Sequence, residues 1–183
     1  DVLFAPSDWA EKNLIKMNLK AEIINMGQNT NVEALYFSLG KGTPPVDIST
    51  PYCLFTVHRV ETILKKSRLE FILDIVAKIS QSRRIVFVMH DPTAKKLRDF
   101  NLLQRLKEYD NVELLNLVPH SEFLILLENA DFVLTDGGSI QEESFYLDAP
   151  CLILRTETER DEGLGANAKI CGFDKEVVSS FLD

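Results

Sequence analysis

The sequence predicts an α/β fold: an open, doubly wound parallel sheet with helices on both faces. Short apolar runs alternate with helical patterns along the whole chain. The strand runs are apolar throughout rather than alternating in polarity, which is typical of strands buried on both faces. With 183 residues, 45% of them hydrophobic and 26% charged, the chain is long enough for one domain with a stable core.

The first part of the chain is predicted to contain two strands and two helices before a loop. Ser7 can cap the first helix through its hydroxyl, and Trp9, Leu14 and Met17 fall broadly on one face of that helix. In order, the predicted elements are a strand at Val2–Ala5, a helix after Ser7, a strand at 21–26, a helix at 31–39, and a loop containing Gly40, Gly42, Pro44 and Pro45.

The remainder alternates strands and helices more regularly. Strands are predicted at 52–57, Arg84–Met89, 112–115, 132–134, 150–154 and 169–171. Helices are predicted from Ser67, at 91–109, at 121–129, from Ser139, and from near Asp174. Ser67 with Glu70 has the spacing of a capping box, and Asp91 with Pro92 is a typical helix start.

The stretch 131–146 has the most informative pattern. Thr135 and Asp136 close a short buried strand, Gly137 and Gly138 allow a sharp turn, and Ser139 lies three residues before an acid, as in a capping box. Such a strand–turn–helix unit leaves backbone N–H groups at the positive end of a helix, where a phosphate or another anion can bind. The glycines alone are equally compatible with a structural loop. Burial of the turn under neighbouring side chains would contradict an anion site.

Two consecutive acids, Glu142 and Glu143, follow the glycine turn within the first turns of the helix. One of these carboxylates can reach ribose hydroxyls beside a bound phosphate. Together with a second polar cluster after the next strand, they favour a ligand site over a structural loop.

Polar groups also follow three other strands: His58-Arg59 with Glu61, His90, and the charged run 155–162. Because ligands of such sheets bind at the carboxyl ends of the strands, these groups are expected to converge. His58 and Arg59 can bind a phosphate or an oxyanion, although Arg59 can instead pair with Glu61 on the surface. His90 can instead cap the next helix.

The run from Arg155 to Glu162 is either a solvated face or, because Gly163 and Gly165 follow it, a loop that folds over a ligand. His120 precedes Ser121 at a helix start and is expected to be structural.

The composition indicates in which compartment the protein is found and which classes of partner it is not expected to bind. Cys53, Cys151 and Cys171 lie in or beside apolar runs without metal-ligand spacing, which indicates reduced core thiols and a cytoplasmic location. The net charge of −8 argues against nucleic-acid and acidic-membrane binding. No apolar run approaches the roughly 20 residues of a membrane span. Both ends of the chain are expected to be cuts in a longer protein.

Three ordered motifs resemble those of the non-hydrolysing UDP-N-acetylglucosamine 2-epimerases, in their C-terminal half. The family's T-D-S-G-G-x-Q-E-E, R-x-x-T-E-R-P-E and H-R-x-E-N correspond to the segments 135–143, 155–162 and 58–62. The segments 3–7, 13–14 and 90–97 match as well, so that the resemblance spans nearly the whole chain.

The resemblance implies a Rossmann-like domain that is the nucleotide-binding half of a glycosyltransferase-B-like two-domain fold. Residues 1–183 would form this single domain, with 1–45 leading from the missing N-terminal domain and 46–183 forming the core. Members of the family are isomerases of cell-surface polysaccharide biosynthesis, which interconvert UDP-GlcNAc and UDP-ManNAc by eliminating and re-adding UDP. The resemblance further implies a UDP or UDP-N-acetylhexosamine ligand, a homodimer, and no metal or cofactor.

The resemblance also implies residue roles. Glu143 would hold the ribose hydroxyls, and the amides of Gly138 and Ser139 with Arg160 and His58 would hold the diphosphate. His58 and Glu162 would line the sugar cleft and are the catalytic candidates. The other residues expected to bind UDP are Arg59, His90, Asp136, Gly137, Glu142 and Arg155.

Three departures from the family pattern leave alternatives open. The family's Ser-Gly-Gly is Gly137-Gly138-Ser139 here, its Asn is Thr62, and its Pro after the motif arginine is Asp161. The acid and base groups that move the C2 proton belong mainly to the family's N-terminal domain, so the chain alone is expected to be inactive. The alternatives are a non-catalytic nucleotide-sugar-binding module, or a hydrolysing epimerase or glycosyltransferase on the same fold.

Overall fold

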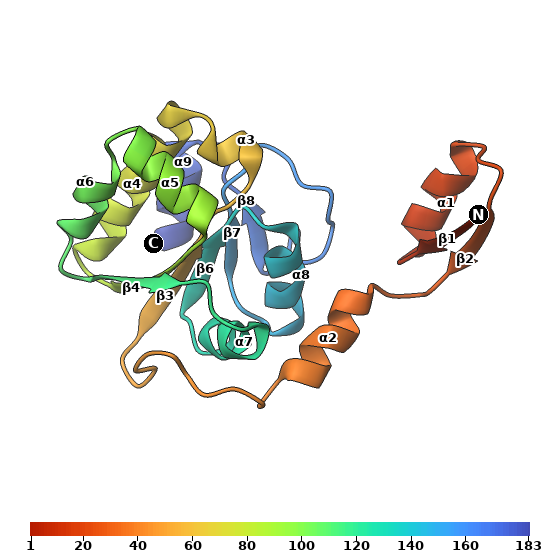
Figure 1. Ribbon diagram of the computed structural model, residues 1–183, viewed down its shortest axis with the longest axis horizontal. Coiled ribbons are helices and arrows are strands. Elements are labelled where there is room, and N and C mark those ends of the chain that lie inside the picture. Colours follow the sequence, from red (N-terminus) through yellow and green to blue (C-terminus); the bar gives the residue numbers. More distant parts are fainter.

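The computed structural model describes all 183 residues, as a small N-terminal unit and a larger α/β core (Figure 1). The elements in order are β1 (Val2–Ala5), α1 (Asp8–Lys16), β2 (Glu22–Asn25), α2 (Thr30–Ser38), β3 (Tyr52–Thr56), α3 (Val60–Ile63), α4 (Lys66–Ser80), β4 (Arg84–Met89), α5 (Asp91–Asp99), α6 (Leu103–Lys107), β5 (Val112–Asn116), α7 (His120–Glu128), β6 (Phe132–Thr135), α8 (Gly138–Tyr146), β7 (Cys151–Ile153), β8 (Ala168–Ile170) and α9 (Lys175–Leu182).

The core is a six-stranded sheet in the order β5-β4-β3-β6-β7-β8, and every neighbouring pair is parallel. The chain builds one side of the sheet from β3 outward, then returns to β6 and builds the other side. The strand order therefore reverses between β3 and β6, which is where ligands bind in open α/β sheets. The predicted doubly wound parallel sheet is confirmed.

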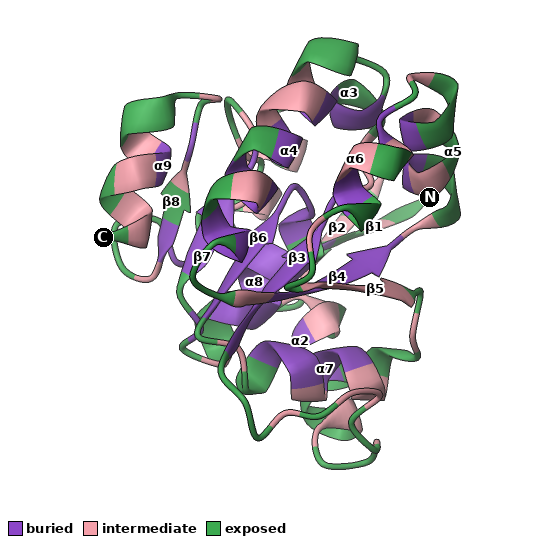
Figure 2. Ribbon diagram, turned by 90° about the vertical axis from the view of Figure 1, so that its left-hand side faces the viewer, coloured by how far each residue is buried: buried purple, intermediate pink, exposed green.

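Apolar packing covers both faces of this sheet. Phe55 and Phe87 point to one face, where they pack with residues of α4 and α9, whereas Leu54 and Val86 point to the other, towards α7. This alternation of fully buried positions explains the unbroken apolar strand sequences. Figure 2 shows the central strands β3, β4, β6 and β7 as a buried layer between helices.

The N-terminal unit consists of β1, α1 and β2, with its two strands paired in parallel in a separate sheet. Ser7 caps α1 as predicted, because its Oγ accepts a hydrogen bond from the N–H of Ala10 at 3.2 Å. The predicted apolar face is not buried: α1 has no buried residue, and Trp9 and Met17 are 63% and 62% exposed. A two-stranded sheet offers too little surface to cover that face. In Figure 1 the unit lies apart from the core and is joined to it through α2.

Several helix boundaries differ from the prediction, most clearly those of α4 and of the predicted helix at 91–109. Helix α4 begins at Lys66 without a side-chain cap, so the capping box of Ser67 and Glu70 is wrong. The predicted helix at 91–109 is divided into α5 and α6 because Asn101 adopts a left-handed φ of 58°. His90 rather than Asp91 occupies the N-cap position of α5, without a side-chain hydrogen bond.

The three cysteines are buried free thiols, as predicted. Burial raises the pKa of Cys53 and of Cys151 to about 12, so both thiols stay protonated at neutral pH. No helix combines the length and the apolar character needed to cross a bilayer.

Candidate functional site

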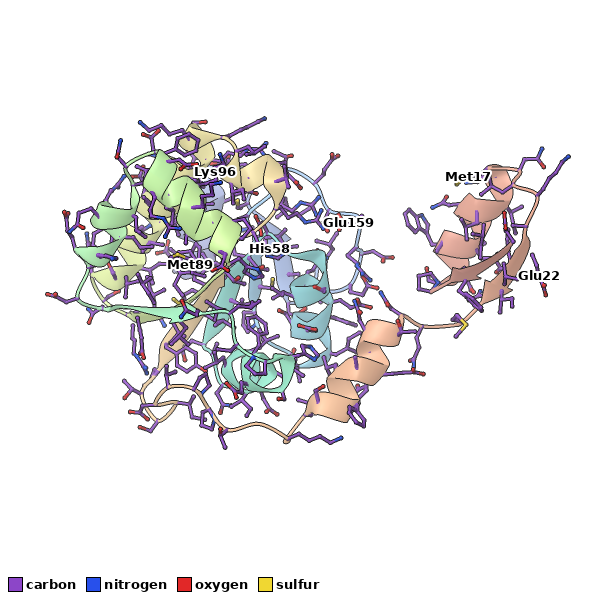
Figure 3. The ribbon with its side chains drawn as sticks, in the orientation of Figure 1. Met17, Glu22, His58, Met89, Lys96 and Glu159 are labelled. Atoms are coloured by element: carbon purple, nitrogen blue, oxygen red, sulfur yellow. The ribbon has the colours of Figure 1, made fainter.

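The four polar clusters predicted at strand ends lie at one edge of the sheet, as expected. The rings of His58 and His90, which follow β3 and β4, stack with centroids 4.5 Å apart. A β-carbon placed on Gly137, after β6, would lie 3.0 Å from Cε1 of His58. Arg155, after β7, reaches the same region through Glu159. Figure 3 shows His58 and Glu159 beside the start of α8.

Asp136 fixes the loop that carries His58 and Arg59. Its side chain is fully buried, and its two carboxylate oxygens accept hydrogen bonds from the backbone N–H groups of His58 at 2.9 Å and Arg59 at 3.0 Å. Nδ1 of His58 lies 3.7 Å from the same carboxylate. Asp136 therefore supports the site from beneath, with both oxygens already engaged by the chain.

The start of α8 differs from the predicted capping box. Gly137 occupies the N-cap position and no side chain caps the helix, while Ser139 lies exposed within the first turn. Glu142 cannot act as the capping acid because its carboxylate pairs with Arg160 at 2.7 Å. The backbone N–H groups of this first turn therefore have no side-chain acceptor, which suits them to an anion.

The glycine turn is not open as expected, because charged side chains cover it. Gly137 and Gly138 are both buried, and a β-carbon on Gly138 would lie 2.7 Å from Oε1 of Glu159 and 3.3 Å from Nη2 of Arg59. Glycine is needed at position 138 because only a residue without a side chain lets these groups come so near the helix end. A carboxylate thus lies beside the amides where an external anion was expected.

Glu159 is held there by two arginines. It pairs with Arg59 and, at 2.6 Å, with Arg155, while Glu61 contacts both arginines at 3.6 and 3.4 Å. The surface pairing of Arg59 with Glu61, the alternative that the sequence left open, is thus present within a larger network. Partial burial raises the pKa of Glu159, but hydrogen bonds from Arg155, its own backbone N–H and Arg59 outweigh this effect and lower the pKa to about 2.

A cavity of about 760 Å³ separates the N-terminal unit from α8 and the loop after β7. Of the predicted site residues, Glu142, Arg160 and Glu162 line it, together with Trp9 and Tyr146. One carboxylate oxygen of Glu162 is buried without a partner, as is one of Glu142. Burial raises the pKa of Glu142, and Arg160 opposes that shift.

Glu143 lies on another side of α8, outside this cavity, and contacts His120. Its Oε1 is 2.8 Å from Nε2 of His120, whose Nδ1 is 3.3 Å from the hydroxyl of Ser38. Burial raises the pKa of Glu143, and the hydrogen bond with His120 opposes the shift. His120 is the first residue of α7, and it also supports the carboxylate expected to hold ribose.

Gln141 and Thr158 were missed as contributors to the site. The amide nitrogen of Gln141 donates to the backbone carbonyls of Arg160 at 3.1 Å and Glu162 at 2.9 Å, and the hydroxyl of Thr158 donates to Oε1 of Gln141 at 2.7 Å. These bonds fasten the loop carrying Arg160 to α8. Their only signal in the sequence is that Gln141 and Thr158 belong to the two motifs.

A family model described as UDP-N-acetylglucosamine 2-epimerase matches residues 1–182. The chain belongs to this family. The UDP-N-acetylglucosamine 2-epimerase of Methanocaldococcus jannaschii is 35% identical over 188 aligned residues, covering 96% of this chain and 51% of that protein. The protein of the same name from Methanococcus maripaludis is 33% identical over 195 aligned residues, covering 100% of this chain and 53% of its own length.

Solved structures of this family share the fold. The crystal structure of the M. jannaschii UDP-GlcNAc 2-epimerase in complex with UDP-GlcNAc and UDP superposes with a TM-score of 0.89 at 32% identity, over 99% of this chain and 53% of that chain. An Escherichia coli heptosyltransferase with ADP, at 17% identity and a TM-score of 0.52 over 75% of this chain and 44% of that chain, shares the fold alone. The chain therefore has a glycosyltransferase-B-like nucleotide-binding fold, and it spans about half the length of the relatives that it matches.

Proposed function

We propose that this chain is the UDP-sugar-binding half of a UDP-N-acetylglucosamine 2-epimerase. The observation that carries the proposal is the convergence of His58, Arg59 and Arg160 on the uncapped start of α8, at the point where the strand order reverses. Backbone amides, arginine side chains and a histidine are the donors that a diphosphate requires. The matching structures with bound UDP support the same ligand class.

The diphosphate and the ribose of UDP each have counterparts in the site. The diphosphate would take the place of the Glu159 carboxylate beside the amides of Gly138 and Ser139, with Arg160 and His58 next to it. The ribose hydroxyls would bind Glu143, whose buried carboxylate is oriented by His120. Asp161, where the family has proline, is exposed, which leaves its charge largely in solvent.

The same donors would assist the reaction. In an isomerase that eliminates UDP across C1–C2 and re-adds it to the opposite face, negative charge develops on the departing diphosphate. Donors already aimed at that charge stabilise the transition state electrostatically. His58 and Glu162 are the residues of this chain that would line the sugar, and the reaction uses no metal or redox cofactor.

The groups that move the C2 proton would come from the other half of the enzyme, so this half alone is expected to be inactive. We place the complete enzyme in the cytoplasm, as a homodimer that supplies cell-surface polysaccharide synthesis. The buried free thiols support a reducing compartment.

Isothermal titration calorimetry of the 183-residue chain tests the binding role. UDP should bind, and Glu143→Ala should weaken binding by about 10- to 100-fold, the value of one or two hydrogen bonds to a charged group. Glu157→Ala, on an exposed side chain of the loop after β7, is the matched control and should bind UDP like the unaltered chain. The absence of binding at millimolar UDP would refute the proposal.

An isotope experiment tests the reaction. The complete enzyme is incubated with UDP-GlcNAc in deuterated water, and epimerisation should place deuterium at C2 of the recovered nucleotide sugar. Unchanged substrate would instead support a non-catalytic binding module. Free ManNAc would support the hydrolysing alternative.

A further inference from the structure

Glu142 makes an unusual set of contacts for a residue predicted to bind a ligand. Its side chain is only 1% exposed, and its Oε2 lies 2.7 Å from Nη1 of Arg160. The same oxygen accepts hydrogen bonds from the side-chain amides of Asn29 at 3.2 Å and Asn31 at 3.5 Å. One carboxylate oxygen therefore joins α8 to two other segments of the chain.

Arg160 can receive an anion at the start of α8 when its guanidinium is fixed by a partner. Its Cγ lies 3.5 Å from the position of a β-carbon on Gly138, so the aliphatic part of the side chain lies at the start of α8. Its guanidinium has one carboxylate partner, Glu142, through Nη1. Because a guanidinium has five N–H donors, a single ion pair fixes the group and leaves donors for a phosphate.

The two asparagines belong to the segment that connects the N-terminal unit to the core. Asn29 is the N-cap of α2, and its Oδ1 accepts a hydrogen bond from the N–H of Asn31 while its Nδ2 donates to Glu142. Gly27, two residues earlier, has a φ of 75° and turns the chain away from β2. Figure 1 shows this connection as the path between the unit of β1, α1 and β2 and the six-stranded sheet.

We propose that Glu142 is a positioning residue, which holds Arg160 over the start of α8 and ties that arginine to the connection at Asn29. The inference rests on the proposed function, because it assigns the diphosphate as the ligand of Arg160. Glu142 acts on UDP through Arg160 and does not touch it. A neutral residue at 142 would leave the arginine without its partner in a largely buried place, where an unpaired charge is unfavourable, so the guanidinium would turn towards solvent.

A double-mutant cycle on the 183-residue chain separates this role from direct binding. Glu142→Gln and Arg160→Gln should each weaken UDP binding by about tenfold or more. The double variant should bind no more weakly than Arg160→Gln alone, because Glu142 has nothing left to position. Uridine, which has no phosphate, should bind all four forms with equal affinity, and Glu157→Gln is the control for loss of a nearby acid.

A third variant tests the hydrogen bond between Asn29 and Glu142. Asn29→Ser keeps a good N-cap for α2 but removes the donor to Glu142. It should weaken UDP binding by a smaller factor than Glu142→Gln does, and leave uridine binding unchanged. Additive losses in the cycle, an equal loss of uridine and UDP affinity, or no loss at all would each overturn the inference.

Nuclear magnetic resonance of the Arg160 Nε–H group gives a readout that does not need UDP. In the free chain, Glu142→Gln should accelerate exchange of this proton and rotation of the guanidinium several-fold. Equal rates in both forms would overturn the inference even if UDP binds. If the unaltered chain fails to bind UDP, the proposed function fails, and these rates still decide whether Glu142 positions Arg160.

Discussion

Asp136→Asn should destabilise the protein more than any other conservative change at the site. The carboxylate accepts one backbone hydrogen bond on each oxygen, from His58 and Arg59. Asparagine keeps one acceptor and turns an NH₂ group towards the other N–H, so one charge-assisted bond is lost and two donors face each other in a fully buried place. One such bond is worth about 1.5–3 kcal/mol, and the unpaired donor adds about 1–3 kcal/mol, so a loss of about 3 kcal/mol is expected.

Urea unfolding followed by circular dichroism measures this loss. With a slope of about 2 kcal/mol per molar urea, the midpoint should fall by about 1.5 M. Asp131→Asn is the matched control, because it precedes the same strand but pairs with Arg83 on the surface at 3.4 Å. That pair should contribute about 0–1 kcal/mol. If both variants shift the midpoint equally, Asp136 does not support the loop as argued.

Three further predictions concern single groups of the site. Gly138→Ala should leave the unfolding midpoint nearly unchanged, because the atoms that its β-carbon crowds are the ends of the flexible side chains of Glu159 and Arg59, but it should weaken UDP binding measured by calorimetry. Gly163 has a φ of 77°, and a β-carbon added there would lie 2.6 Å from Oδ1 of Asn167, so Gly163→Ala should lower the free energy of unfolding by more than about 1 kcal/mol. A larger loss for Gly138→Ala than for Gly163→Ala would contradict this prediction. His120→Ala removes the partner of the buried Glu143 carboxylate and should lower the free energy of unfolding by about 1.5–3 kcal/mol in urea titrations, whereas a change within error would show that the contact is unimportant. Glu159, with a pKa lowered from 4.5 to about 2, contributes stability above about pH 4.5 that is lost as the pH falls towards 2. Because this side chain is half exposed, its two ion pairs should contribute only about 1 kcal/mol. Glu159→Gln should therefore flatten the acid decline in urea titrations between those pH values, and an unaltered decline would contradict the assignment.

The strands were predictable because burial on both sheet faces restricts their composition. Val2–Ala5 and Arg84–Met89 have the predicted bounds, since each is an apolar run between polar or turn residues. Helix starts were less predictable. A serine caps a helix only if its own backbone is extended and the helix begins at the next residue. Ser7 meets this condition, with a φ of −156°, whereas Ser67 and Ser139 lie within their helices.

The convergence of the site was predictable, but its internal contacts were not. Parallel strands end at the same edge, so residues after β3, β4, β6 and β7 had to come together. The partners of Glu142 and Glu143 lie as far as 113 and 23 residues away in the sequence, at Asn29 and His120. Such pairs depend on how α2 packs against α7 and α8, which no local spacing encodes.

The charges of the site bear on how an acidic chain would bind the diphosphate that the proposed function assigns to it. With a net charge of −8, the chain has no overall attraction for anions. Each of the three arginines around α8 is paired with a glutamate: Arg59 and Arg155 with Glu159, and Arg160 with Glu142. The pairs cancel most of the local positive charge but fix the direction of the remaining N–H donors. Attraction for a ligand then depends on oxygen atoms that meet those donors and the helix amides together. Under the proposed function, the diphosphate of UDP would supply such oxygen atoms at close spacing.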